Sequence, residues 1–126
     1  MKVKAGTFDV AVSLELEGFA EEIRAGLAEE VERVSTQCVK QLRGTSPKRT
    51  GAYAKGWTKK LSKTKHSVTA SVYNKAKPSL THLLENGHQK AKGGRVEGVA
   101  HIKPAEDAAA NSLSAGAERL VRGASS

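Results

Sequence analysis

The residues best suited to chemistry in this chain are four histidines, one cysteine and a few carboxylates. A metal site needs several ligands at a characteristic spacing. His82, His88 and His101 show no HExxH or CxxC pattern, and only Glu85 and Glu97 lie near them in the sequence. Nucleophilic catalysis needs a serine, threonine or cysteine beside a base, and no motif indicates that arrangement. We therefore expect no metal site and no enzymatic activity.

Cys38 is the only cysteine, which excludes an intramolecular disulfide. Its place on an apolar helix stripe predicts a buried, unreactive thiol. A chain without disulfides suits a reducing cytoplasm. No apolar run approaches the roughly twenty residues of a membrane-spanning helix, and the alternating pattern of residues 1–18 does not form a secretory signal. We expect a soluble protein that is made in the cytoplasm.

Positive charge is concentrated in the middle of the chain. The net charge is +8, but residues 1–34 hold four basic and eight acidic side chains, whereas residues 35–103 hold fifteen basic and two acidic ones. Such a segment attracts either nucleic acid or an acidic protein surface. No helix-turn-helix, zinc-finger or RNA-recognition pattern accompanies it, and five aromatic residues are too few for a base-stacking platform. Non-specific nucleic-acid binding through residues 48–95 stays open as an alternative function.

The elements that position these residues follow from the spacing of apolar side chains. With 126 residues the chain has room for one domain. Apolar residues occupy every second position of residues 8–16, which predicts a half-buried strand. From Phe19 the spacing changes to three and four, which predicts an amphipathic helix of about 24 residues ending near Gly44. Pro47 and Gly51 then indicate a loop.

Residues 57–74 carry the pattern of a β-hairpin. Two short segments, 57–63 and 67–73, flank a polar stretch, and the second alternates valine and alanine with serine and threonine. A short helix is predicted over residues 80–86, with Ser79 as its N-cap and Gly87 as its terminator. Its buried face is expected to consist of three leucines, Leu80, Leu83 and Leu84.

Residues 88–103 show neither the alternation of a strand nor the three-and-four spacing of a helix. Three glycines, five charged residues and only three large apolar residues predict a mobile basic loop. The glycine pair at 93–94 is interpreted as a flexible hinge, since no GxxxxGK[ST] phosphate-binding motif surrounds it. Pro104 suits the first position of a final helix, whose alanine-rich remainder spans residues 105–120, and residues 123–126 form a frayed tail. The predicted fold is α+β: a long N-terminal amphipathic helix on a small antiparallel sheet, a short middle helix, the loop and a C-terminal helix.

Short motifs follow the long helix in a fixed order. They are SPKRTGAY (residues 46–53), VYN (72–74), LTHLLENGH (80–88), GGRV (93–96) and HIKPA (101–105). In this order they resemble the "gene product ten" tail-component family of long-tailed bacteriophages, and the resemblance covers residues 19 to about 120. Each motif is short, so the specificity comes from their order.

The resemblance implies a structural virion protein, a ring subunit that completes the tail and joins it to the DNA-filled head. It implies a small α+β fold with no cofactor and no active site. The implied partners are identical copies in a ring, a hexamer by this resemblance, with a head-completion or connector protein and a tail-tube or tail-terminator protein. Contact with phage DNA stays open, and no membrane is expected. The protein would assemble in the host cytoplasm and then reside in the neck or tail of the virion.

We expect the loop of residues 88–103 to make the assembly contact, because it has too few apolar side chains to order itself. The expected contact residues are Lys90, Lys92, Gly93, Gly94, Arg95, Val96 and His101. A second contact, between the acidic helix of one copy and the basic middle of the next, would orient the copies. Its expected residues are Glu21, Glu22, Glu29, Glu30, Lys59 and Lys60.

Overall fold

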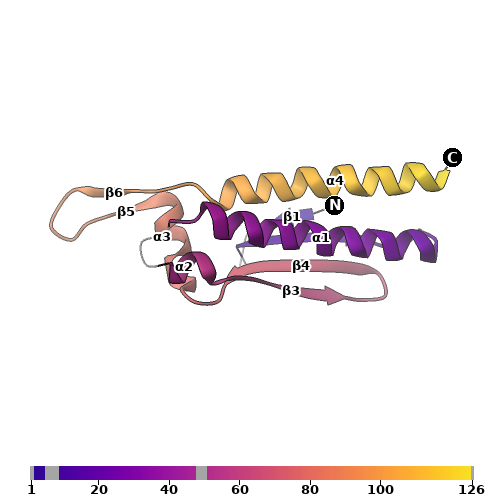
Figure 1. Cartoon of the computed structure of the whole chain (residues 1–126), viewed down its shortest axis with the longest axis horizontal. Helices are drawn as coiled ribbons and strands as arrows, with labels where there is room; N and C mark the ends of the chain where they lie inside the picture. Colours follow the sequence, from indigo (N-terminus) through magenta and orange to yellow (C-terminus); the bar gives the residue numbers. More distant parts are fainter. Residues whose placement is uncertain (1, 5–8, 48–50, 126) are drawn as a thin grey trace.

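The computed structural model describes residues 2–4, 9–47 and 51–125 of the chain. Two long helices run side by side in opposite directions, and a sheet lies against them (Figure 1). The predicted α+β fold is confirmed. In chain order the elements are β1 (Lys2–Lys4), β2 (Val10–Glu15), α1 (Glu21–Thr45), α2 (Ala52–Lys55), β3 (Trp57–Lys63), β4 (Ser67–Asn74), the 3₁₀ turn η1 (Pro78–Leu80), α3 (Thr81–Asn86), β5 (Gly87–Gln89), β6 (Arg95–Glu97) and α4 (Ile102–Ser125).

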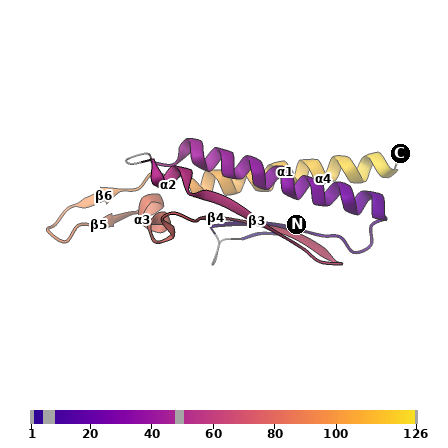
Figure 2. The same ribbon diagram turned by 60° about the horizontal axis from the view of Figure 1, so that its bottom comes forward.

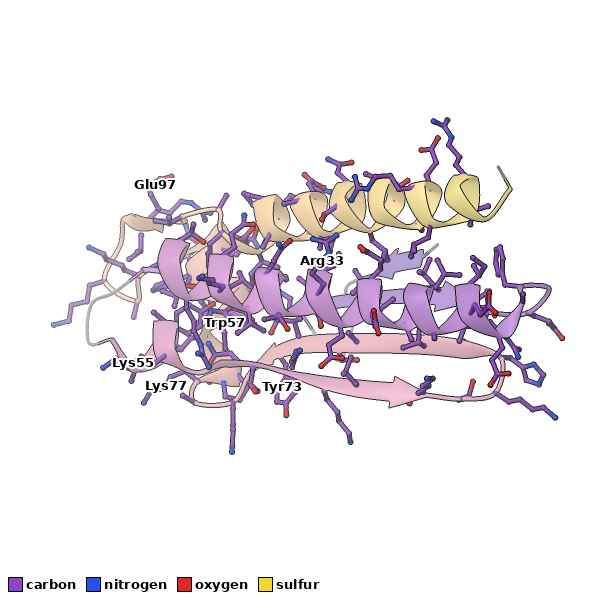
Figure 3. The ribbon with its side chains drawn as sticks, turned by 45° about the vertical axis from the view of Figure 1, so that its right-hand side comes forward. Arg33, Lys55, Trp57, Tyr73, Lys77 and Glu97 are labelled. Atoms are coloured by element: carbon purple, nitrogen blue, oxygen red, sulfur yellow. The ribbon has the colours of Figure 1, made fainter. Side chains whose placement is uncertain are left out.

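Four strands form one antiparallel sheet in the order β1-β2-β4-β3. The predicted hairpin is confirmed as β3 and β4, and the predicted first strand as β2, although its Phe8 lies outside the described residues. Buried and half-buried residues alternate along β4, so that Val68, Ala70 and Val72 face the helices. Serine and threonine side chains and Tyr73 lie on the other face, which no helix of the described chain covers (Figures 2 and 3).

The long helix α1 packs its apolar stripe on the sheet. The buried apolar side chains follow the predicted spacing: Leu27, Val31, Val34, Cys38 and Leu42. Burial raises the pKa of the Cys38 thiol to about 12, so this side chain is a neutral part of the core. The helix ends where the sequence predicts, because Ser46 is extended in front of Pro47.

Small side chains let α4 approach α1 closely. A β-carbon at Gly116 would collide with the carboxylate of Glu30 on α1, so the glycine makes room for that side chain. Arg33 lies between the two helices (Figure 3), where it pairs with Glu30 at 2.6 Å and donates to Ser112 Oγ at 3.4 Å. The two helices are therefore joined by polar contacts as well as by their apolar faces.

The last helix begins at Ile102, two residues before the predicted start. Pro104 thus lies inside the first turn, where its missing N–H removes no hydrogen bond, since the first N–H groups of a helix have no intrahelical acceptor. The buried side of α4 is made of Ala105, Ala109 and Leu113. Among the described helices, none combines the length and the apolar character that a bilayer crossing requires.

The short helix predicted over residues 80–86 is present, but its start and its buried face differ from the prediction. Ser79 lies inside the 3₁₀ turn η1 and therefore does not cap α3, which begins at Thr81. Thr81 is buried, whereas Leu83 is 43% exposed, so the predicted buried face is wrong for Leu83. A turn with three residues per repeat in front of the helix shifts the phase of the buried positions. Gly87 ends the helix as predicted, with a φ of 80°.

The loop expected over residues 88–103 contains a hairpin. Its strands β5 and β6 are joined by a turn in which Gly93 and Gly94 have φ values of 93° and 82°. Glycine adopts such values without strain, so the two glycines close a turn where the sequence indicated only a hinge. His101 and Ile102, at the other end of the expected loop, are buried. The mobility of the hairpin in the free protein stays a prediction.

Replacing Leu27 by alanine should lower the free energy of unfolding by about 2 to 5 kcal/mol, because it empties a buried leucine site under α1. Glu29→Ala, on the exposed side of the same helix, should change it by less than about 0.5 kcal/mol. Thermal and urea melts of the two variants measure the difference. The reverse ranking would show that the helix face is wrongly assigned.

Candidate assembly arm and its buried anchor

The β5–β6 hairpin projects from one end of the molecule (Figure 1), and we call residues 87–97 the arm. Its two strands form a separate sheet, in the register Gly87↔Glu97, His88↔Val96 and Gln89↔Arg95. Residues 89–95 are exposed and carry three positive charges, on Lys90, Lys92 and Arg95. A two-stranded hairpin is at best marginally stable by itself in water. The arm therefore depends on what holds its base and on any surface that it meets.

The base of the arm is fixed to α3. Gly87 has a positive φ, and a β-carbon at this position would collide with the backbone of the opposite strand. Arg95 Nη2 donates to the Asn86 carbonyl at 2.5 Å, and the Val99 N–H donates to the Leu84 carbonyl at 2.8 Å. Both ends of the hairpin are thus bound to the same short helix, which sets the direction in which the arm leaves the body.

The carboxylate of Glu85 joins this base to the start of α4. Its Oε1 accepts the backbone N–H groups of His101 and Ile102, each at 2.7 Å, and its Oε2 accepts that of Lys103 at 2.9 Å. The positive end of the helix dipole also favours an anion here. Burial by itself raises the pKa of Glu85, but the three N–H donors and His101 outweigh it and hold the pKa below its usual 4.5. Glu85 therefore acts as an ionised cap of α4, supplied by α3.

His101 lies fully buried behind this cap. Its Nδ1 is 2.6 Å from the Val99 carbonyl and 2.9 Å from Glu85 Oε1, and both oxygens can only accept, which assigns the proton to Nδ1. Nε2 then accepts from the Tyr53 hydroxyl at 2.7 Å. Burial raises the pKa of Tyr53, so the hydroxyl stays protonated as this donor. The rings of Tyr53, Trp57 and His101 meet edge to face, with centroids 5.6 to 6.3 Å apart.

Hydrogen bonds continue from the aromatic rings to the end of α1 and to the sheet. Trp57 Nε1 donates to Ser46 Oγ at 2.8 Å, and that hydroxyl donates to the Leu42 carbonyl at 2.5 Å. Asn74 Nδ2 donates to the Tyr53 carbonyl at 2.8 Å. In Figure 3 Trp57 lies between β3 and α1. We call this set of connected side chains the anchor: Ser46, Tyr53, Trp57, Asn74, Glu85 and His101.

The order of groups from Glu85 through His101 to Tyr53 is the carboxylate, imidazole and hydroxyl order that nucleophilic catalysis uses. Here the imidazole is fully buried and Tyr53 is 5% exposed, so no substrate reaches the hydroxyl in this conformation. Within the residues that the structure describes, no group of three or more His, Cys, Asp or Glu side chains is arranged to hold a metal ion. What the arrangement achieves chemically is to satisfy buried polar groups where four helices and the sheet meet.

The residues expected to make the assembly contact divide into two groups. Lys90, Lys92 and Arg95 lie with the glycine pair on the exposed part of the arm. Val96 is half-buried, and His101 belongs to the buried anchor. The expectation of a surface contact is therefore wrong for His101, because the cap of α4 holds its backbone and Tyr53 holds its ring.

The residues expected to form charge contacts between copies are also placed differently. Three remain exposed on α1, toward the end remote from the arm (Figure 1): Glu21, Glu22 and Glu29. Glu30 is not free for a second copy, because it pairs with Arg33 and packs against α4. Lys59 Nζ donates to Thr36 Oγ1 at 2.5 Å, which ties it to α1, whereas Lys60 is exposed.

Sequence reasoning found neither the Glu85 cap nor the Tyr53–His101 pair. The partners are far apart in the chain, by 16 residues for Glu85 and His101 and by 48 for Tyr53 and His101. All three lie inside the motifs SPKRTGAY, LTHLLENGH and HIKPA. Their joint presence in those motifs is the signal that could have found them, but spacing along one chain does not show which motifs meet.

Comparison of the chain with known protein families, with curated proteins and with solved structures found no match. The basis for a function is therefore the order of the motifs and the geometry of the arm and its anchor.

Glu85→Gln should lower the free energy of unfolding by about 1 to 2 kcal/mol near neutral pH, because a neutral amide caps α4 less well. Since the folded pKa of Glu85 is lowered, the cap contributes in full above a pH of about 4.5 and its contribution is lost as the pH falls through the folded pKa. The difference from wild type should therefore shrink in acid. Urea melts between about pH 7 and about pH 3 measure it.

Glu97→Gln, on the exposed side of the arm, is the matched control and should follow the wild-type curve. If Glu85→Gln follows that curve as well, the cap does not contribute to stability as the geometry indicates.

Proposed function

We propose that the protein is a structural subunit of a long-tailed bacteriophage that works in a ring to complete the tail and join it to the DNA-filled head. Two features support this proposal: the order of the sequence motifs, which resembles the "gene product ten" family, and the arm that projects from the body (Figure 1). The arm is the observation that carries it, since a projecting element with a fixed base is suited to contact a neighbour.

The arm combines an exposed cationic tip with a base that is held from two sides. The Gly87 N–H and the Arg95 side chain bond the base to carbonyls of α3, and the Glu85 carboxylate joins α3 to the start of α4. The tip buries little of its surface in its own chain, as the exposure of residues 89–95 shows. A partner surface of negative charge would both order the tip and fix its orientation.

The end of the molecule remote from the arm carries exposed carboxylates. Glu15 and Glu17 lie just before α1, and Glu21 opens it. Lys65 and Arg122 are exposed at the same end. The cationic arm of another copy would therefore be attracted by the carboxylates and repelled by these two cations, which restricts how it can dock. With the arm at one end and carboxylates at the other, identical copies can touch head to tail, and such contacts close into a ring when the rotation permits. Six copies remain an implication of the resemblance.

Non-specific binding to DNA is the second candidate function, and the lysines along the outer strand favour it. Lys60 and Lys63 are exposed on opposite faces of β3, and Lys65 follows at the turn. Phosphates can approach the edge of this strand, where both faces are within reach, without any base-specific contact. The cationic tip of the arm would add to the same attraction.

Reversing the charge of the arm tip with Lys90→Glu and Lys92→Glu should leave thermal melts unchanged, because both side chains are exposed. It should also prevent the joining of tails to heads, so that electron micrographs of a complementation lysate show separate heads and tails. Lys75→Glu with Lys77→Glu makes the same charge change at exposed sites away from the arm and should join normally.

The same preparations test whether the protein is part of the virion, since mass spectrometry of purified particles should detect it. Its absence from virions would overturn the proposal. Normal joining by the arm variant would remove the arm as the contact.

If the second candidate is correct, the protein should be retained on duplex DNA at low salt. The logarithm of its affinity should then fall by about 0.9 per neutralised phosphate for each decade of salt. Lys60→Gln with Lys63→Gln should reduce that slope by about 2. No retention at low salt would exclude DNA as a partner.

A further inference from the structure

The outer edge of β3 carries backbone groups that have no hydrogen-bond partner among the described residues. In an antiparallel pair, alternate residues bond to the neighbouring strand. The Gly56 carbonyl accepts from the Lys75 N–H at 2.8 Å just before β3, and the Thr64 N–H donates to the Ser67 carbonyl at 2.8 Å just after it. Even-numbered residues of β3 therefore bond to β4. The odd-numbered ones point their N–H and C=O groups outward: Lys59, Leu61 and Lys63.

Arg43 of α1 marks where this edge begins. Its Nε and Nη2 donate to the Trp57 carbonyl at 3.2 and 2.8 Å, so this odd-numbered carbonyl also points away from β4. The guanidinium occupies the first outward acceptor of the strand. The unpaired stretch then runs over residues 59–63, with β3 as the last strand of the sheet (Figure 1). A partner strand of about five residues fits along it.

A groove lies between this edge and α1. It has a volume of about 430 Å³ and is lined by Thr36, Val39, Lys40, Arg43, Thr58 and Lys59. Three of the six lining residues are cationic and none is acidic; Glu32, one turn earlier on α1, is the nearest carboxylate along that helix. Val39 offers an apolar surface, and Leu61, on the helix-facing side of β3, is 40% exposed beside it. The site thus combines strand hydrogen-bonding groups, cations and a small apolar surface.

We propose that the β3 edge binds an extended acidic segment of a partner protein, which adds to the sheet as a fifth strand. The backbone of β3 would supply the hydrogen bonds, and Lys40, Lys59 and Lys63 would select carboxylates on the incoming strand. This site lies apart from the arm and does not depend on ring formation. Lysines on an edge strand also discourage pairing with the same edge of another copy, because like charges would meet.

Two other occupants fit the site less well. Among the described strands, β2 and β6 carry a carboxylate, Glu15 and Glu97. The first is already bonded on both sides, to β1 and to β4, and the second carries Arg95 beside Glu97 in the cationic arm, so neither gives a second copy a free strand with an excess of carboxylates. DNA would use the lysines but not the alternating N–H and C=O groups of the edge. A peptide uses both, and the experiment separates these cases.

The probe is a fluorescein-labelled octapeptide in which valine and glutamate alternate, and its binding to the full-length chain is followed by fluorescence polarisation. Leu61→Pro removes one outward N–H without touching the bonds to β4, and proline is tolerated on an edge strand at such positions. It should weaken binding at least about tenfold. Leu61→Ala removes more apolar surface than Leu61→Pro does but keeps the N–H, and it should weaken binding less than about threefold.

A second measurement needs no variant of the protein. Two copies of the peptide are N-methylated at alternate residues, one at the valines and one at the glutamates, so that each loses the donors of one edge only. The copy methylated on its outer edge should bind wild-type protein with the affinity of the parent peptide. The copy methylated on the edge that faces β3 should bind at least about tenfold more weakly.

Three results would overturn the proposal. The first is that the parent peptide does not bind, or that an octapeptide of valine and lysine binds equally well. The second is that Leu61→Pro binds the peptide as wild type does and that both N-methylated copies bind as the parent does. Charge attraction without backbone hydrogen bonds would then explain the binding. The third is that duplex DNA displaces the peptide and binds Leu61→Pro as tightly as wild type, which would make the edge a phosphate-binding surface.

Discussion

The bond between the Glu85 carboxylate and the first N–H groups of α4 is the interaction on which the arrangement of this molecule depends. It is the point where α3, the base of the arm and the last helix meet. A buried helix start without a cap leaves several donors unsatisfied, and each unsatisfied group costs about 1 to 3 kcal/mol. By capping α4 from α3, one side chain fixes the place of the helix and the exit of the arm together.

The same carboxylate extends its effect through a chain of buried polar groups. Glu85 orients His101, and His101 orients Tyr53. The Tyr53 carbonyl in turn accepts a hydrogen bond from the side-chain amide of Asn74, at the end of β4. The core around them is aliphatic and would accept several packings of similar energy. Hydrogen bonds inside a core are directional, and a fully satisfied set of them favours one packing over the others.

The two surfaces considered for partners differ in how they use the backbone. The two strands of the arm are paired with each other, and a partner would contact mainly the cationic side chains of its exposed tip. The edge of β3 has unpaired N–H and C=O groups as well as lysines. Charge attracts a partner to either surface, but the seven-residue β3 offers a longer unpaired edge for adding a strand than the three-residue strands of the arm. A chain with both can contact two neighbours at once, from its end and from its side.

Periodicity in the sequence was enough to determine α1, β2 and the β3–β4 hairpin, because each has a single buried face whose spacing is visible over many residues. It also placed Cys38 in the core and Gly87 at a helix end. These features are local, since every position is judged against its near neighbours.

The position of every buried polar group was decided only by the tertiary structure. Glu85 looks like an exposed carboxylate in the sequence, His101 like a loop residue and Ser46 like part of a turn, yet all three act through partners on other elements. The arm was missed for a related reason, since two three-residue strands are too short for a period to be visible. Hydrogen bonds between distant segments leave no spacing in a single chain, because the fold alone brings donor and acceptor together.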